Sequence, residues 1–351
     1  MPTLYLHVGA GKTGTSYLQA QCALQHSRLA HHGLWYPITE RLLRRVRKGK
    51  VTSGNLERDV LGWLCPRHHK LAVHGAKQHQ LVAADWLGGL LAEAEGRDVL
   101  LSSETLQFAD PERVSRLAQH VADANYSLRI LFYGRHALDH AISNYREHLQ
   151  GGFHRSVYRP ERHSLNGWLR QRTVPFKSTL DVYCHAVGKD AVVVRSYDAA
   201  KHQLFNCFLS NLGLSAAADL EPVDSFSTVN RSLTVAETQF LERAASVLTS
   251  DQVAALGAVL MAAPPCDAAV AGARGFAIDP AALEIFEQRH VPMFAEINQD
   301  WGSTLEQPLE VVPSDFAGSA AHADPDHLLA IAMHLLGMQG AVHAWEGRHR
   351  P

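Results

Sequence analysis

The segment from His7 to Ser16 combines glycines, a lysine and hydroxyl side chains in the pattern of an anion-binding loop. Residues 4–8 alternate like a short strand before it, and residues 15–29 are predicted to form a helix after it. Main-chain N–H groups at such a helix N-terminus attract a negative group. We therefore predict that a phosphate or sulfate is bound by Gly11, Lys12, Thr13, Gly14, Thr15 and Ser16.

A nucleoside-triphosphate P-loop, G-x-x-x-x-G-K-[ST], is the first alternative for this loop. Gly11, Lys12 and Thr13 fit the end of that pattern, but Leu6 occupies the place of its first glycine. An enzyme of that class would also need an acidic magnesium ligand at the end of a strand. A nucleotide kinase therefore remains the alternative interpretation of the loop.

A second anion-binding pair follows later in the chain. Arg135 comes directly after a predicted strand at residues 128–133, and Ser143 lies eight residues further along, on a predicted helix at residues 137–150. A guanidinium offers a bidentate pair of donors and a hydroxyl offers a third, which together suit a terminal phosphate. The pair predicts a second phosphate site.

These two segments resemble the donor site of sulfotransferases that use 3'-phosphoadenosine 5'-phosphosulfate (PAPS). Lys12 to Ser16 matches all five places of their 5'-phosphosulfate loop, K-[ST]-G-[ST]-[ST]. The segment from Arg135 to Tyr145 is similar to their 3'-phosphate signature, R-x-P-x-D-x-x-x-S-x-Y, although Ala137 replaces the proline.

Two weaker similarities extend the resemblance. Tyr197, after a predicted strand at residues 191–195, resembles the tyrosine near the adenine in the family's Y-E-D segment, and Arg231 lies where a late basic segment often closes over the 3'-phosphate. The resemblance implies PAPS as the donor and 3',5'-adenosine diphosphate as the product. It implies a hydroxyl or amine of a small molecule, glycan or lipid as the acceptor. A homologue that binds an adenosine phosphate without turnover is a second alternative.

The transfer itself needs a proton acceptor and a group that stabilises the leaving oxygen. Lys12 is expected to stabilise the leaving oxygen. Glu104 is the predicted base, because it follows a predicted strand at residues 98–103, where ligands bind in open α/β sheets, and because the family commonly takes its base from this stretch. His7 is the alternative base, with His136 and His140 as further candidates.

Strands and helices alternate along the chain, which favours an α/β fold with a mainly parallel, three-layer sheet covered by helices on both faces. The resemblance makes this the P-loop-like sulfotransferase fold. We expect one domain over residues 1–312, followed by a linker and a C-terminal helix at residues 313–351 packed on it. Residues 36–80 and 151–176 are predicted surface loops that form the acceptor side, and their Arg and His content favours an acidic or polar acceptor.

The composition excludes several other classes of protein. The 351 residues include 33 basic and 35 acidic side chains, so bulk attraction to nucleic acid is not expected. No run of about 18 apolar residues predicts a membrane span, and no secretory signal is expected. Five dispersed cysteines suit a reducing compartment, so a cytoplasmic protein is predicted. The histidines between residues 65 and 79 match no zinc template, and no metal site is predicted.

Overall fold

The computed structural model divides into two compact units. The first comprises residues 1–135, 175–229 and 293–309, and the second comprises residues 136–174, 230–292 and 310–351. The residues that the structure describes are 1–49, 54–66, 76–152, 164–215, 219–223, 232–246, 248–262, 276, 278–302 and 305–314, with the main chain alone for 76–84. The expected single domain over residues 1–312 stays a prediction.

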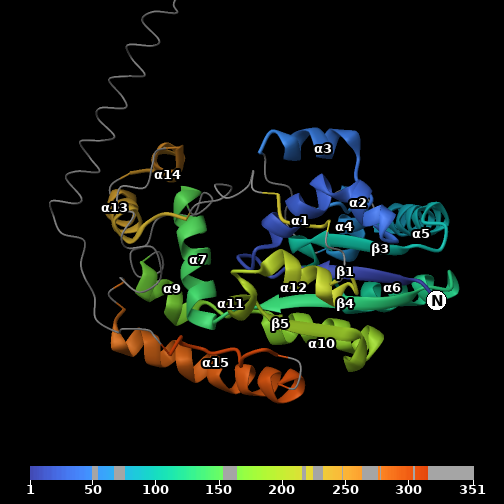
Figure 1. The fold of residues 1–351 in the computed structure, drawn as a ribbon. Coiled ribbons are helices and arrows are strands. Elements are labelled where there is room, and N and C mark those ends of the chain that lie inside the picture. The colour runs from blue at the N-terminus through green and yellow to red at the C-terminus, as the bar shows by residue number, and fades with distance from the viewer. Residues whose placement is uncertain are drawn as a thin grey trace, which may run out of the picture. The chain divides into compact units, whose positions relative to one another are not determined.

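A five-stranded parallel sheet forms the centre of the first unit (Figure 1). Its strands, in the spatial order β2-β3-β1-β4-β5, are β2 (Leu34–Trp35), β3 (Asp98–Ser103), β1 (Thr3–Val8), β4 (Ser127–Gly134) and β5 (Val192–Ser196). β1 is the central strand, and its last residue pairs with Ser103 on one side and Phe132 on the other. Because every pairing is parallel, the carboxyl ends of the strands meet at one edge. The predicted α/β class is confirmed.

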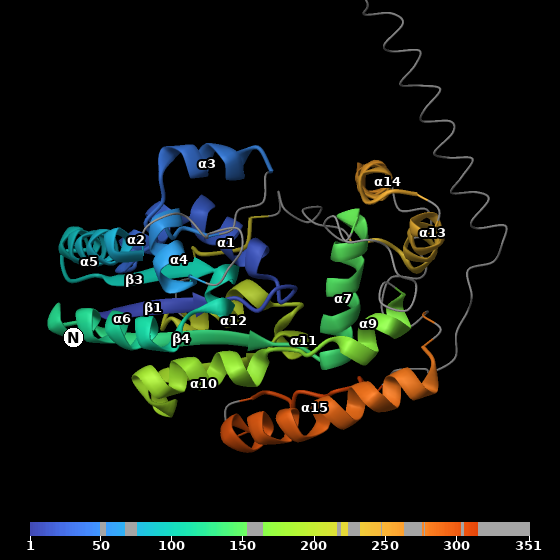
Figure 2. The ribbon, with the colours of Figure 1, turned by 180° about the vertical axis from the view of Figure 1, so that it is seen from behind.

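Both faces of this sheet are covered by helices. On one face, Tyr5 of β1 packs in a buried cluster with side chains of α1 (Thr15–Leu24) and α12 (Leu204–Asn211). On the other face, Phe132 of β4 lies edge-on to Phe176 of α10 (Phe176–Val187), which packs beside α6 (Pro111–Asp123) (Figure 2). A sheet covered on both faces needs apolar residues at successive positions, which accounts for the apolar runs at residues 4–6 of β1, 99–101 of β3 and 130–133 of β4.

Several helices of the first unit differ from the sequence-based prediction. The predicted helix at residues 15–29 is interrupted at Gln25, where α2 (His26–His31) begins on a new axis. After β5 the chain forms two helices, α11 (Tyr197–Ala200) and α12, which are separated at residues 201–203. α4 (Arg58–Leu64) and α5 (Ala76–Glu93) occupy part of the region predicted as a surface loop.

The largest correction within residues 36–80 is α3 (Glu40–Arg47). Thr39 caps this helix by accepting a hydrogen bond from the main-chain N–H of Leu42 at 3.3 Å. Leu43 and Val46 are buried, three residues apart on one side of the helix. The high density of arginine in this segment hides a short amphipathic helix, which is why we expected a loop there.

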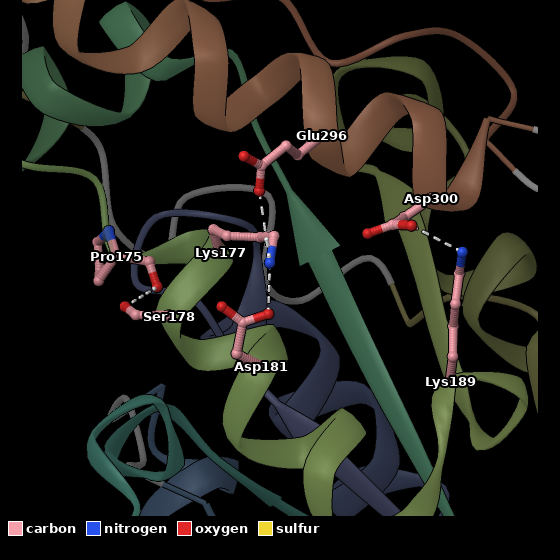
Figure 3. A network of polar contacts seen from close by, with 7 residues as sticks. All are labelled: Pro175, Lys177, Ser178, Asp181, Lys189, Glu296 and Asp300. Carbon is pink, nitrogen blue, oxygen red and sulfur yellow. Dashed lines mark hydrogen bonds and ion pairs between the residues drawn. The ribbon is translucent and has the colours of Figure 1, made fainter.

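The C-terminal part of α15 (Pro280–Trp301) belongs to the first unit from residue 293 onward. Lys177 lies 3.6 Å from Glu296, and Lys189 lies 2.8 Å from Asp300; Figure 3 shows both ion pairs. Such exposed ion pairs contribute little individually. The buried Trp301 fixes the end of the helix more firmly, because its indole N–H donates to the carbonyl of Val192 in β5 at 3.0 Å.

The described part of the second unit is helical. It contains α7 (Ala137–Gln150), α9 (Leu165–Gln171), α13 (Val235–Ala245), α14 (Ser250–Ala262) and the first part of α15. The predicted bounds of α7 are confirmed. α13 begins with a capping box, in which the Thr234 hydroxyl accepts from the N–H of Glu237 and the Glu237 carboxylate accepts from the N–H of Thr234. Among the described helices, none is both long and apolar enough to cross a membrane.

Candidate active site

The carboxyl ends of four neighbouring strands carry the residues that the sequence predicts for donor binding and transfer. The anion loop follows β1, Glu104 follows β3, Arg135 follows β4, and Tyr197 follows β5. Their strands are adjacent in the order β3-β1-β4-β5, so these residues lie along one edge of the sheet. Ligands bind at this edge in open α/β sheets.

The anion loop turns sharply before α1. Lys12 has a φ of 69° and Gly14 a φ of 76°, both in the left-handed region. A Cβ at Gly14 would lie 2.3 Å from Cδ2 of Leu204, so this contact and the positive φ both favour glycine. The Thr13 hydroxyl closes the turn by donating to the carbonyl of Ala10 at 2.6 Å. Because Gly14 is the N-cap of α1, no side chain caps the N–H groups of its first turn.

Thr15 provides a direct sign that the loop suits an anion. Its side chain is buried, and its hydroxyl oxygen has no hydrogen-bond partner among the described residues. A buried hydroxyl without a partner costs free energy, so such a group normally binds a ligand or water. The hydroxyl lies in the first residue of α1, where the helix dipole favours negative charge. The residues of the loop therefore fit a phosphate or sulfate group.

Arg135 connects the anion loop to the end of β5. Its guanidinium donates to the main-chain carbonyl of Lys12 at 3.2 Å and lies over the ring of Tyr197, 5.3 Å from the ring centroid. Asp198 approaches the same guanidinium at 3.9 Å, and its side chain is 6% exposed. The structure thus brings together three of the sequence-predicted residues, and it adds Asp198 as an acidic neighbour with no predicted role in the site.

Glu104 is the first residue of the short 3-10 helix η1 (Glu104–Phe108), immediately beyond β3. The hydroxyl of Ser16, in the first turn of α1, donates to its carboxylate at 3.5 Å. The neighbouring Ser103 is buried and caps η1 by accepting from the N–H of Thr105. The predicted base is therefore partly exposed and lies beside the helix N-terminus that receives the anion.

Asn55 holds the end of β3 in place, and the sequence analysis missed it. β2 ends at Trp35, opposite Val99, and the outer edge of β3 beyond that point is covered by Asn55. Its side-chain amide donates to the carbonyl of Leu100 at 2.9 Å and accepts from the N–H of Ser102 at 2.8 Å. These two bonds reproduce the pairing of a neighbouring strand. We call this arrangement the Asn55 clamp.

Gly54 allows the clamp to approach so closely. It has a φ of 113°, and a Cβ there would lie 1.8 Å from the carbonyl oxygen of Ser102. The partners of Asn55 lie 45 and 47 residues away in sequence, so local sequence patterns carry no signal of the contact. A glycine followed by an asparagine ahead of a helix predicts only a turn.

His7 lies within the covered face of the sheet. Its Nδ1 forms a hydrogen bond with the Ser102 hydroxyl at 2.9 Å, and Ser102 also accepts from the Gln19 side chain at 3.1 Å. The ring packs against Phe208 and is fully buried. Burial lowers the pKa of His7 to about 3, so the ring is neutral near pH 7. A side chain without exposure cannot meet an acceptor directly, which argues against His7 as the base.

Three of the predicted residues belong to the second unit. Ser143 is on α7 in the second unit and is partly exposed. His136 accepts from the main-chain N–H of Glu310 at 3.2 Å, and His140 is buried beside Asn144. These contacts give both histidines structural roles in the second unit.

Other predictions fall on residues that the structure does not describe. Arg231 lies outside the described residues, as do residues 153–163 of the predicted loop at 151–176 and nearly all of residues 313–351. The same holds for the histidines between residues 67 and 75. In the described part of the chain, no three His, Cys, Asp or Glu side chains come together as a metal site would require.

Comparisons with known proteins give likenesses in structure only. No family model matches the sequence, and no curated protein matches it. The solved structure of a sulfotransferase from Alicyclobacillus acidocaldarius matches with a TM-score of 0.37 and 17% identity, over 65% of this chain and 85% of that one. A sulfotransferase domain from the curacin biosynthetic pathway matches with a TM-score of 0.36 and 13% identity, over 82% of this chain and 97% of that domain. Function must therefore be inferred from the chain's own residues.

Proposed function

We propose that this chain is a sulfotransferase that moves the sulfuryl group of PAPS to a hydroxyl or amine acceptor. The observation that carries the proposal is the alignment of the anion loop, Glu104, Arg135 and Tyr197 at the carboxyl ends of four adjacent strands. A kinase of the P-loop class would need the anion loop. It would not need Arg135 and Tyr197 at the ends of the next two strands. The predicted cytoplasmic location stays a prediction.

Donor binding follows from the chemistry of these groups. The open N–H groups of α1, Lys12 and the unpartnered Thr15 hydroxyl would bind the 5'-phosphosulfate. Arg135 would bind the 3'-phosphate and Tyr197 would pack near the adenine. Because Arg135 also donates to the carbonyl of Lys12, occupation of one phosphate site would help to fix the loop at the other.

The transfer step requires few groups from the protein. PAPS supplies the sulfuryl group and a leaving phosphate. The acceptor oxygen or nitrogen forms a bond to sulfur as the bond from sulfur to the bridging oxygen breaks. Glu104 would take the proton of the acceptor, and Lys12 would stabilise the negative charge that develops on the bridging oxygen. The Ser16 hydroxyl, within 3.5 Å of Glu104, would orient that carboxylate.

Calorimetry tests donor binding. The chain should bind 3',5'-adenosine diphosphate without magnesium and more tightly than ATP. Arg135→Ala should weaken that binding by about tenfold or more, because a charge-assisted hydrogen bond is lost. Arg129→Ala is the matched control, since Arg129 is an exposed residue of the same strand and pairs opposite Tyr5, near the other end. Tighter, magnesium-dependent ATP binding would replace our proposal with a nucleotide kinase.

Turnover is tested separately with radiolabelled PAPS and pools of acceptors. Glu104→Gln should lower the transfer rate by about 100-fold or more while leaving the affinity for 3',5'-adenosine diphosphate unchanged. Glu112→Gln, at a highly exposed position of α6, is the control. Undiminished transfer by Glu104→Gln would show that another group is the base. Tight nucleotide binding with no transfer to any pool would favour a non-catalytic homologue.

A further inference from the structure

α3 presents an unusually dense group of positive charges. Arg41, Arg44, Arg45, Arg47 and Lys48, which we call the α3 basic face, are all exposed. They fall within eight successive residues of a chain whose formal net charge is −2. Within the described residues, no carboxylate lies within ion-pair distance of any of them, and the side chain of Arg44 reaches only the main-chain carbonyl of Glu40.

The stability of the helix does not explain this charge. Arg41 and Lys48 each lie three or four residues from both Arg44 and Arg45, so these four side chains lie on one side of α3 and repel one another. Cations in the last turn complement the helix dipole, but Arg41 lies in the first turn, where a cation is unfavourable. An external anion would relieve this repulsion.

The apolar side of α3 is already occupied. Val46 belongs to the buried cluster formed with α1, and Leu43 is 3% exposed. Figures 1 and 2 both show α3 lying along the outside of α1. A helix that inserts into a membrane surface needs a free apolar side, and α3 has none to offer. The arrangement therefore favours a hydrophilic polyanion over a lipid surface.

α3 is joined to the candidate active site by a short stretch of chain. Gly49, two residues after the end of α3, is five residues before Gly54, so their Cα atoms are at most about 18 Å apart. Gly54 lies against the main chain of Ser102, two residues before Glu104. The Asn55 clamp thus fixes the chain that leaves α3 to the strand that carries the predicted base.

We propose that the α3 basic face binds an anionic glycan, and that this glycan is the acceptor. Only the second part of this proposal, that the glycan is the acceptor, rests on the proposed sulfuryl transfer. A glycan with carboxylate or sulfate groups supplies regularly spaced negative charges to the arginines and many hydroxyl groups to the base. α3 is about 12 Å long, which is enough to contact several charges of an extended polymer at once.

Binding is tested with polygalacturonate as the anionic probe and dextran as its neutral counterpart. The protein should bind polygalacturonate and not dextran, with an affinity that falls steeply as salt is added. The triple variant Arg44→Gln, Arg45→Gln and Arg47→Gln should bind at least about tenfold more weakly at low salt and with a shallower salt dependence. The control variant removes three exposed cations elsewhere, by Arg116→Gln, Arg129→Gln and Arg243→Gln, and should bind as the unmodified protein does.

Three further measurements separate the outcomes. Equal polymer binding by the unmodified protein and the triple variant would overturn the proposal, as would binding of RNA or of anionic phospholipid vesicles without binding of polygalacturonate. Affinity for 3',5'-adenosine diphosphate should be the same in all three proteins. If the nucleotide does not bind at all, the sulfotransferase function fails while the glycan site can still be judged. Transfer from radiolabelled PAPS to polygalacturonate should fall in the triple variant through a raised KM, and transfer to dextran instead would overturn the acceptor assignment.

Discussion

The buried ring of His7 should make the protein's stability depend on pH in a way that one substitution removes. The ordinary pKa of histidine is 6.5, and burial lowers that of His7 to about 3. Between these two values the unfolded chain binds a proton at His7 that the folded protein does not bind. Stability must therefore fall as the pH is lowered through this range.

The size of the effect follows from the two pKa values. Between about pH 7.5 and pH 5, the lowered pKa of His7 should cost about 2 kcal/mol of unfolding free energy, and more as the pH approaches 3. The substitution His7→Asn removes the titrating ring and places an amide nitrogen near the position of Nδ1, where it can still bond to Ser102. The variant should be less stable than the unmodified protein at neutral pH, because the substitution leaves a cavity. Its unfolding free energy should nevertheless fall less on acidification than that of the unmodified protein.

Urea denaturation at a series of pH values measures this difference. The relevant quantity is the change in unfolding free energy with pH, so a variant that is less stable overall still gives an answer. His31→Asn is the matched control, because it makes the same substitution at an exposed histidine. The reasoning is refuted if His7→Asn and the unmodified protein lose the same free energy between the two pH values. That result would mean that the His7 ring is protonated in the folded protein, and His7 would return as a candidate base.

Three other substitutions test the framework of the site. Asn55→Ala strips buried partners from the main chain of Leu100 and Ser102 and should lower the unfolding free energy by about 2–4 kcal/mol in urea titrations, whereas an unchanged midpoint would show that the Asn55 clamp is not needed. Gly14→Ala should weaken binding of 3',5'-adenosine diphosphate by about tenfold or more in calorimetry, because a φ of 76° and the contact with Leu204 both oppose a side chain. Gly89→Ala is the control. It should bind the nucleotide normally, because a Cβ at Gly89 would lie in open space. Thr234→Ala should cost about 1 kcal/mol by removing one half of a capping box, and Thr234→Ser should recover most of it in thermal melts.

The sequence predicted the buried strands well because a strand covered on both faces carries a run of apolar residues. Residues 99–101, Val-Leu-Leu, form such a run, and the predicted bounds 98–103 match β3. α3 was missed for the opposite reason. Its two buried residues, Leu43 and Val46, are outnumbered by arginines, and charge density obscured the helical spacing. The break between α11 and α12 carries no proline or glycine, so it depends on packing that a sequence pattern does not express.

The residues of the candidate site also divide into those that a local sequence pattern predicts and those that it does not. Lys12 and Arg135 could be predicted because each follows a strand and belongs to a short local pattern. The Asn55 clamp could not, because its meaning depends on main-chain groups more than forty residues away. The burial of His7 could have been anticipated. In a parallel sheet with helices on both faces, a residue between the buried Leu6 and Val8 is enclosed as well.

The central position of β1 has a consequence for how the chain acquires its structure. β1, the strand that carries the anion loop, is synthesised before its partners β3 and β4, which begin at Asp98 and Ser127. Closing such long loops costs conformational entropy, which makes the pairing of β1 slow. Both edges of β1 stay unpaired until the partner strands have left the ribosome. During this interval the nascent chain exposes a short apolar strand with two free edges, which is a hazard for aggregation. Expression at reduced temperature, or with a chaperone that shields nascent chains, should therefore raise the yield of folded protein more than changes to the C-terminal residues would.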